Sequence, residues 1–110
     1  MAEIKKINSL EEYDEFVNAP GTLNVIKVGA EWCGQCRVLE GYIKNLSQED
    51  VDGVLLGEVD ADDEWFEDKV DELGIRGIPV LVAFNGGEEK ERLHGAAPKD
   101  SLISFFNRNK

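Results

Sequence analysis

Apolar residues recur along the chain in two distinct spacings. The runs 23–29, 54–59 and 80–84 are short, largely apolar and rich in Val, Leu and Ile, which is typical of buried strands. Elsewhere apolar residues recur every three or four positions, which predicts amphipathic helices with one face toward a core. The expected inward faces are Leu10, Tyr13, Phe16 and Val17; Val38, Leu39, Tyr42, Ile43 and Leu46; Phe66, Val70 and Leu73; and Leu102, Ile103 and Phe106.

Capping and turn residues mark where these elements begin and end. Ser9 and Glu12 form a capping box before the first helix, and Pro98 begins the last one. Asn85-Gly86-Gly87 follows an apolar run and predicts a tight hairpin turn. The polar segment 88–94 after this turn suits a strand at the edge of a sheet.

The order of the elements predicts the fold class. With a weak strand over 4–7, the order is β, α, β, α, β, α, β, β, α. Such alternation predicts a mostly parallel sheet with helices on both faces, and the late hairpin adds an antiparallel edge, so the class is α/β. We find no internal repeat, low-complexity tract or linker, and we expect residues 1–110 to form a single domain.

Acidic residues dominate the charge of the chain. The 23 Asp and Glu outnumber the 12 Lys and Arg, and a formal net charge of −11 repels DNA, RNA and anionic lipid. No apolar stretch approaches the roughly eighteen residues that span a bilayer, and the start of the chain is polar. We therefore expect a cytosolic protein with no nucleic-acid and no membrane partner.

The two cysteines, Cys33 and Cys36, lie three positions apart, where a predicted strand turns into a helix. Together with His94 they are too few to enclose a zinc ion, so no metal site is expected. A disulfide across so short a loop constrains little of the fold. A Cys-x-x-Cys pair beside a βαβ pattern instead indicates redox chemistry.

The place of each thiol predicts its role. A free thiol is mostly protonated at neutral pH because its pKa is about 8.5, but the unpaired amides at a helix start favour the thiolate. Cys33 is therefore the expected nucleophile, and Cys36, one turn further on, is the expected resolving thiol. Trp32, beside the nucleophile, is expected to be an exposed platform for substrate.

Several motifs together carry a resemblance to a known family. The segment 30–36 resembles the active-site loop of thioredoxins, 74–80 resembles their proline-bearing stretch, and the strand end 58–62 and the hairpin 85–87 also match. The resemblance implies the thioredoxin fold, a central mixed β-sheet flanked by helices on both faces. It also implies a monomer that reduces disulfide-containing proteins, acting in electron transport and cell redox homeostasis. No bound cofactor is implied, and the electrons would come from an upstream disulfide reductase.

The same resemblance implies where substrate binds. It implies a cis peptide bond between Ile78 and Pro79, which leaves the Ile78 backbone free to pair with an extended substrate. It places Gly95 in a groove beside the exposed tryptophan, where a missing side chain permits close approach. Gly34 and Gln35, between the cysteines, belong to the same substrate-binding loop.

Three departures from the thioredoxin pattern affect the chemistry. Gln35 stands where thioredoxins usually have proline, and Gly41 stands where their helix commonly kinks at proline. Lys27 and Glu58 occupy the positions of a buried Asp and its Lys partner, so the charges are exchanged. An unpaired ammonium in an apolar strand is costly, so Lys27 is expected to pair with Glu58, the alternative being that it snorkels to solvent. In the pair, Glu58 would take the proton of Cys36 and Lys27 would favour the thiolate.

These departures leave two alternatives to a reductase. A disulfide oxidant or isomerase would share every motif but have a higher reduction potential. A non-catalytic subunit would instead stabilise a partner through the groove of Trp32, Ile78 and Gly95. The acidic run 60–64 is also expected to favour basic substrates, the alternative being a merely solvated face.

Overall fold

The computed structural model describes residues 2–110 and contains a five-stranded sheet in the order β1-β3-β2-β4-β5. The elements are β1 (Lys5–Lys6), α1 (Leu10–Val17), β2 (Leu23–Gly29), α2 (Gly34–Lys44), β3 (Val54–Asp60), the 3₁₀ helix η1 (Glu64–Phe66), α3 (Glu67–Leu73), β4 (Val80–Asn85), β5 (Glu88–His94) and α4 (Lys99–Asn109). The predicted order of strands and helices is confirmed, with η1 as an addition before α3.

The sheet is mixed rather than mostly parallel. β3 pairs in parallel with β1 and β2, whereas β4 runs antiparallel to both β2 and β5. The expected predominance of parallel pairs is wrong because α3 is too short. Its seven residues span about 10 Å, whereas β3 is about 23 Å long. The chain is therefore not carried back along the sheet, and β4 begins at the end where β3 stops.

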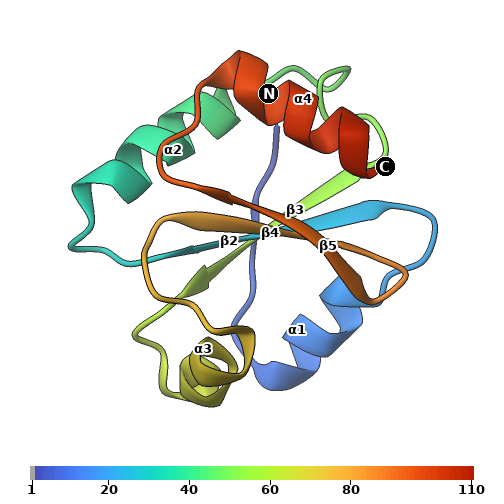
Figure 1. The fold of residues 1–110 in the computed structure, drawn as a ribbon. Coiled ribbons are helices and arrows are strands. Elements are labelled where there is room, and N and C mark those ends of the chain that lie inside the picture. Colours follow the sequence, from blue (N-terminus) through green and yellow to red (C-terminus); the bar gives the residue numbers. More distant parts are fainter. Residues whose placement is uncertain (1) are drawn as a thin grey trace.

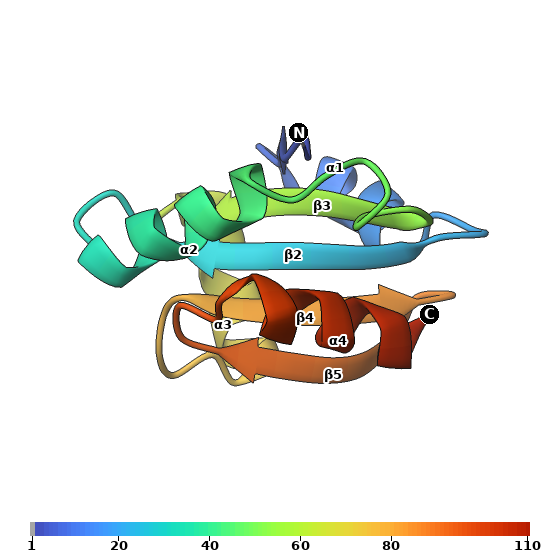
Figure 2. The same cartoon turned by 90° about the horizontal axis from the view of Figure 1, so that it is seen from above.

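Helices cover both faces of the sheet, with α2 and α4 on one face and α1 and α3 on the other (Figure 1). Seen from above, α4 lies over β4 and β5, and α2 lies over the other half of the sheet (Figure 2). Each face has its own apolar core. Leu39 and Phe106 belong to the core under α2 and α4, and Phe16 and Phe66 belong to the core on the opposite face. The predicted α/β class is confirmed.

Three side chains expected in the core are exposed instead. Leu10 is 44% exposed, Val38 45% and Tyr42 37%. Val38 and Tyr42 lie beside the narrow stripe of α2 that faces the sheet, which includes Leu39 and Ile43. The remaining departures are the half-buried Val70, Leu73 and Ile103, and Phe105, which the pattern left out and which is fully buried.

The longest helices of the described chain are α2 and α4, with 11 residues each. α2 continues through Gly41 without interruption. Within residues 2–110, no helix is both long enough and apolar enough to cross a membrane.

The two edges of the sheet are polar. Gly86 and Gly87, with φ angles of 62° and 82°, form the predicted hairpin turn that leads from β4 into the edge strand β5. No residue of β5 is fully buried, as its polar pattern predicts. Arg108 of α4 is hydrogen-bonded to this strand, because its Nε and Nη2 each donate to a carboxylate oxygen of Glu91 at 2.8 Å. At the opposite edge, β1 consists of two exposed lysines.

Candidate active site

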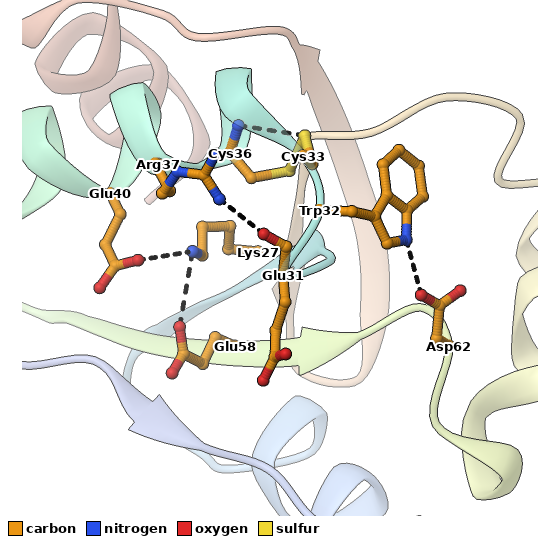
Figure 3. Close-up of a disulfide and its surroundings, with 9 residues drawn as sticks. All are labelled: Lys27, Glu31, Trp32, Cys33, Cys36, Arg37, Glu40, Glu58 and Asp62. Atoms are coloured by element: carbon orange, nitrogen blue, oxygen red, sulfur yellow. Dashed lines mark hydrogen bonds and ion pairs between the residues drawn. A yellow bond between two sulfur atoms is a disulfide. The ribbon is translucent and has the colours of Figure 1, made fainter.

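The two cysteines form a disulfide at the start of α2, directly after β2 (Figure 3). Cys33 is the N-cap residue of the helix, and its Sγ accepts a hydrogen bond of 3.1 Å from the backbone amide of Cys36. Both residues are nearly buried, with 7% of Cys33 and 4% of Cys36 exposed. The predicted position at a strand-to-helix junction is confirmed, and the Cys36 amide of the first turn points toward the sulfur of Cys33.

The end of β2 leaves room for the second sulfur. A Cβ atom added to Gly29 would lie only 3.0 Å from the Sγ of Cys36. The carbonyl of Gly29 accepts a 2.8 Å hydrogen bond from the amide of Ala61, and the Ala30 carbonyl accepts a 3.2 Å hydrogen bond from the amide of Cys33. Gly29 is not among the predicted site residues, although a glycine in a strand is a signal for close approach by another group.

Trp32 is the exposed aromatic residue of the site. It is 70% exposed, and its indole Nε1 donates a 2.8 Å hydrogen bond to Asp62 (Figure 3). The amide of Asp62 in turn donates to the carboxylate of Asp60 at 2.8 Å. The acidic run after β3 therefore lies on the same side of the molecule as the cysteines, as predicted. Its specific contact with the indole could not be expected from the sequence pattern.

Pro79 and Gly95 lie together at this end of the sheet. Val80 pairs with Val28 of β2 and with His94 of β5, so the residues just before and after these strands gather near the end of β2. The amide of Gly95 donates a 2.9 Å hydrogen bond to the carbonyl of Pro79. The Ile78–Pro79 peptide bond is cis, as the resemblance implied.

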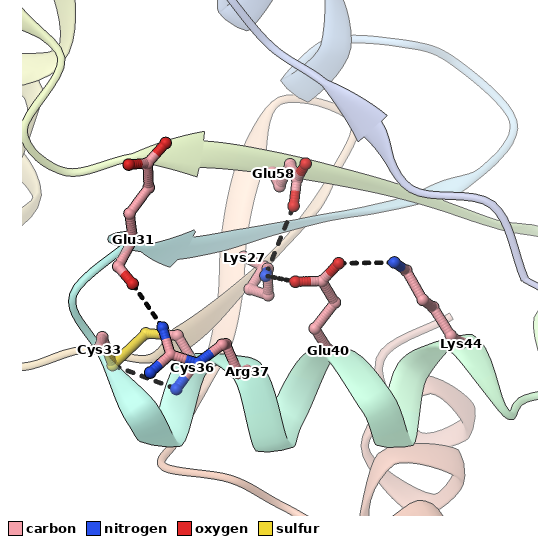
Figure 4. Close-up of polar contacts among 8 residues, drawn as sticks. All are labelled: Lys27, Glu31, Cys33, Cys36, Arg37, Glu40, Lys44 and Glu58. Carbon is pink, nitrogen blue, oxygen red and sulfur yellow. Dashed lines mark hydrogen bonds and ion pairs between the residues drawn. A yellow bond between two sulfur atoms is a disulfide. The ribbon is translucent and has the colours of Figure 1, made fainter.

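A buried lysine lies between two carboxylates behind the disulfide (Figure 4). Only 6% of Lys27 is exposed, and its Nζ lies 3.5 Å from Glu58 and 3.8 Å from Glu40. Glu58 faces Lys27 in the β2–β3 register, so the predicted pair forms, and the snorkelling alternative is wrong. Glu40, which the sequence analysis missed, also contacts Lys44 at 2.7 Å. This hydrogen bond is the main cause that lowers the pKa of Glu40, and Lys27 adds to it against the effect of burial.

These charged groups line a cavity of about 330 Å³ that reaches Cys36. Lys27, Glu40 and Glu58 form part of its wall together with Gly29. Among residues 2–110, no three His, Cys, Asp or Glu side chains are grouped as they would be to hold a metal ion. The chemistry that this arrangement supports is exchange at a sulfur, with ionisable groups close to the second cysteine.

The chain is similar to thioredoxins over nearly its whole length. The family model described as Thioredoxin matches residues 4–108. A thioredoxin of Chlamydia caviae is 38% identical over 104 residues, which are 94% of this chain and 97% of that protein. The chloroplastic M-type thioredoxin of Zea mays is 32% identical over 98 residues, which are 89% of this chain and 58% of that protein.

A solved structure agrees with the sequence comparisons. The X-ray structure of Fasciola hepatica thioredoxin matches this fold with a TM-score of 0.83 at 24% identity, covering 97% of this chain and 100% of that one. The shared fold, the match over residues 4–108 and the cysteine pair at the start of α2 show that the chain belongs to the thioredoxin family, a family of thiol-disulfide oxidoreductases.

Proposed function

We propose that the protein reduces disulfide bonds of other proteins through a dithiol cycle of Cys33 and Cys36. The observation that carries this proposal is the disulfide at the start of α2, next to the 70% exposed Trp32. The helix start favours the Cys33 thiolate, because the unpaired amides of the first turn interact with its negative charge.

The cycle has two exchange steps. The Cys33 thiolate attacks a substrate disulfide, forms a mixed disulfide and releases one substrate thiolate. The Cys36 thiolate then attacks the Sγ of Cys33, which releases the second substrate thiolate and leaves the protein oxidised. An upstream disulfide reductase supplies the two electrons that restore the dithiol.

We assign substrate binding to the surface around Trp32 and the end of the sheet. The hydrogen bond from its indole to Asp62 orients this exposed ring beside the disulfide. Gly95 has no side chain beside Pro79, which leaves space for the main chain of a substrate. The proposed substrate-binding residues are Trp32, Gly34, Gln35, Ile78, Pro79 and Gly95.

We assign acid–base and electrostatic roles to the charged pair behind the disulfide. Glu58 and Lys27 line the same cavity as Cys36, so a proton can pass between the thiol and the carboxylate through water. In this role Glu58 takes the proton from Cys36 before the resolving step, and the Lys27 ammonium favours the thiolate.

The charge of the chain also indicates what it binds and where it acts. The net charge of −11 opposes binding to nucleic acid and anionic membranes, which supports action on other proteins. We place the protein in the cytosol, as a monomer that needs no bound cofactor.

Turnover of insulin disulfides with different electron donors tests this function. We expect reduction with dithiothreitol or with a disulfide reductase of the thioredoxin type, and none in a Cys33→Ser, Cys36→Ser variant. If the double variant retains its biological role while losing insulin reduction, the chain acts as a partner-stabilising subunit instead.

A disulfide oxidant or isomerase is the second candidate, favoured by Gln35, which stands between the cysteines where thioredoxins usually have proline. Its reduction potential would be higher than that of a reductase. Equilibration with glutathione buffers decides between the two. A potential above that of the cytosolic glutathione pool would identify an oxidant, and a potential below it a reductant.

A further inference from the structure

We propose that Glu40 is a positioning residue, which offsets the charge of Lys27 and so keeps the Cys36 thiol protonated. Glu58 then takes the proton when the resolving step begins. The inference rests on the redox role proposed for the two cysteines and adds a residue that controls the resolving step. It gives the two carboxylates that contact Lys27 different roles, because only Glu58 exchanges a proton.

Glu40 lies on the side of α2 that carries Cys36. The two residues are four positions apart in the helix, and residues with this spacing are neighbours on one side of it. Both line the cavity behind the disulfide. Figure 4 shows the Glu40 side chain reaching from α2 toward Lys27 of β2. A carboxylate at this place disfavours a thiolate at Cys36, because both groups carry negative charge.

The buried ammonium of Lys27 has the opposite effect on Cys36. A lone cation on the wall of this cavity would favour the thiolate. Its Nζ, however, lies 3.8 Å from Glu40 and 3.5 Å from Glu58, so two negative charges stand against one positive charge. The other charged groups on the wall are two cations and two carboxylates, namely Lys6, Arg37, Glu31 and Asp60. Glu40 therefore tips the local charge toward the protonated thiol.

The contacts of the two carboxylates differ. Glu40 also contacts Lys44 at 2.7 Å, one turn further along α2, and this hydrogen bond is the main cause that lowers its pKa. Within the described chain, Lys27 is the one cation in ion-pair contact with Glu58. When Glu58 takes up a proton, Lys27 stays paired with Glu40, so the buried ammonium is not left alone.

This arrangement sets the order of events in the resolving step. The proton of the Cys36 thiol passes to Glu58, and the thiolate that remains attacks the Sγ of Cys33. The bond between Cys33 and the substrate breaks, and its electron pair leaves with the substrate sulfur as a thiolate. Glu40 exchanges no proton and makes no bond in this step.

The ionisation of Cys36 tests this role. In a Cys33→Ser variant Cys36 is the one remaining thiol, and the ultraviolet absorbance of its thiolate measures its acid dissociation constant. Adding Glu40→Gln removes a negative charge and should raise this constant about five-fold. Adding Lys44→Gln leaves the charge of Glu40 less opposed and should lower the constant.

The opposite signs separate an electrostatic role from a structural one. If the Glu40–Lys44 pair served only to hold the helix in place, the two substitutions would move the constant of Cys36 in the same direction. A shift of the same sign in both variants, or no shift in Glu40→Gln, overturns the inference. Glu11→Gln, in α1 on the opposite face of the sheet, changes the net charge equally and should leave the constant unchanged.

The decay of a trapped mixed disulfide measures the effect on the reaction. Glu40→Gln should speed resolution about two-fold, because a thiolate that is about five times more abundant is also a weaker nucleophile. Glu58→Gln should slow it, because that carboxylate takes the proton. Equal slowing in both variants would make Glu40 a second base and refute the inference. Insulin reduction with dithiothreitol, measured on the unmodified protein, tests the proposed function separately.

Discussion

The sulfur of Cys33 occupies the place where a helix N-cap side chain normally accepts a backbone hydrogen bond. Once the disulfide is reduced, a thiolate at this place interacts with the unpaired amides, whereas Cys36 lies one turn further along α2. We therefore expect the two thiols to differ in reactivity, although their exposure differs by only a few per cent, 7% against 4%.

This difference predicts selective alkylation of the reduced protein. At mildly acidic pH and with limiting iodoacetamide, Cys33 should be modified first because its thiolate is the better stabilised. Peptide mapping by mass spectrometry measures the order. Modification of Cys36 before Cys33 would contradict the assignment of the nucleophile.

The ammonium of Lys27 leads to a second prediction about single residues. Glu58→Gln should slow the resolving step but cost only about 1 kcal/mol, because Glu40 still pairs with Lys27 and both carboxylates are partly exposed. Removing both carboxylates leaves a buried cation unpaired and should cost about 3 kcal/mol. Urea unfolding and the decay of a trapped mixed disulfide measure the two effects.

A compensating pair of substitutions separates stability from rate. Lys27→Met with Glu58→Leu should recover the free energy of unfolding without recovering the rate of resolution. If Glu58→Gln changes neither the urea midpoint nor turnover, the pair has no part in the reaction and the proton of Cys36 passes to water.

At the scale of single residues, contacts between neighbours along the sequence could be predicted. Contacts between different strands and helices could be predicted only in part. The Lys27–Glu58 pair was expected because the family pattern aligns the two positions. Glu40 and Gly29 were missed because their contacts depend on how α2 lies across the end of β2. The angle between α2 and β2 cannot be predicted from any local sequence pattern.

At the scale of elements, hydrogen bonds to the carboxylate of Glu91 join α4 to β5, and their contribution to stability depends on pH. Arg108 and Asn109 donate to the carboxylate of Glu91, and these hydrogen bonds lower its pKa from 4.5 to about 2. Because the folded pKa lies below the ordinary value, the stabilisation is complete above about pH 4.5. It is lost as the pH falls toward about 2.

Glu91→Gln tests this coupling. The wild type should be slightly more stable than the variant at neutral pH, and the difference should vanish as the pH falls from about 4.5 to about 2. Urea midpoints across this range measure it, and Glu88→Gln on the same strand is the control. If the urea midpoints of wild type and Glu91→Gln differ by the same amount at every pH, the hydrogen bonds to Glu91 do not contribute to the pH dependence of stability.

Element boundaries could be predicted from local signals, whereas strand direction could not. The Ser9 hydroxyl accepts from the amide of Glu12 at 3.2 Å, which confirms Ser9 as the N-cap, and the Glu12 carboxylate accepts at 3.2 Å from the amide of Asn8, one residue before the cap. The direction of β4 depends on the length of α3 compared with the sheet. The sequence predicts where that helix ends, at Gly74, but not how its length compares with that of the strands.

At the scale of the whole molecule, part of the acidic charge lies beside the proposed substrate-binding surface. Asp62 accepts the hydrogen bond of the Trp32 indole, Asp60 accepts one from the amide of Asp62, and the net charge is −11. Attraction across such a face raises the association rate of basic partners and is screened by salt.

The rate of substrate association should therefore depend on salt. For a substrate with a basic segment next to its disulfide, we expect the second-order rate of reduction to fall several-fold between about 0.05 and 0.5 M salt. An acidic substrate serves as the control and should react faster as salt is added. If the rates for both substrates do not depend on salt, the acidic run is only a solvated face and does not attract basic substrates.

The polar edges of the sheet affect how an unfolded client is handled. A partly unfolded protein offers extended segments, which readily add to an open sheet as an extra strand. Here one edge is the charged strand β5, and at the other the two lysines of β1 pair with Gly57 and Glu58 of β3. We therefore expect the charged edges to disfavour such pairing, so that a partly unfolded substrate would exchange at the disulfide without being seeded into an assembly.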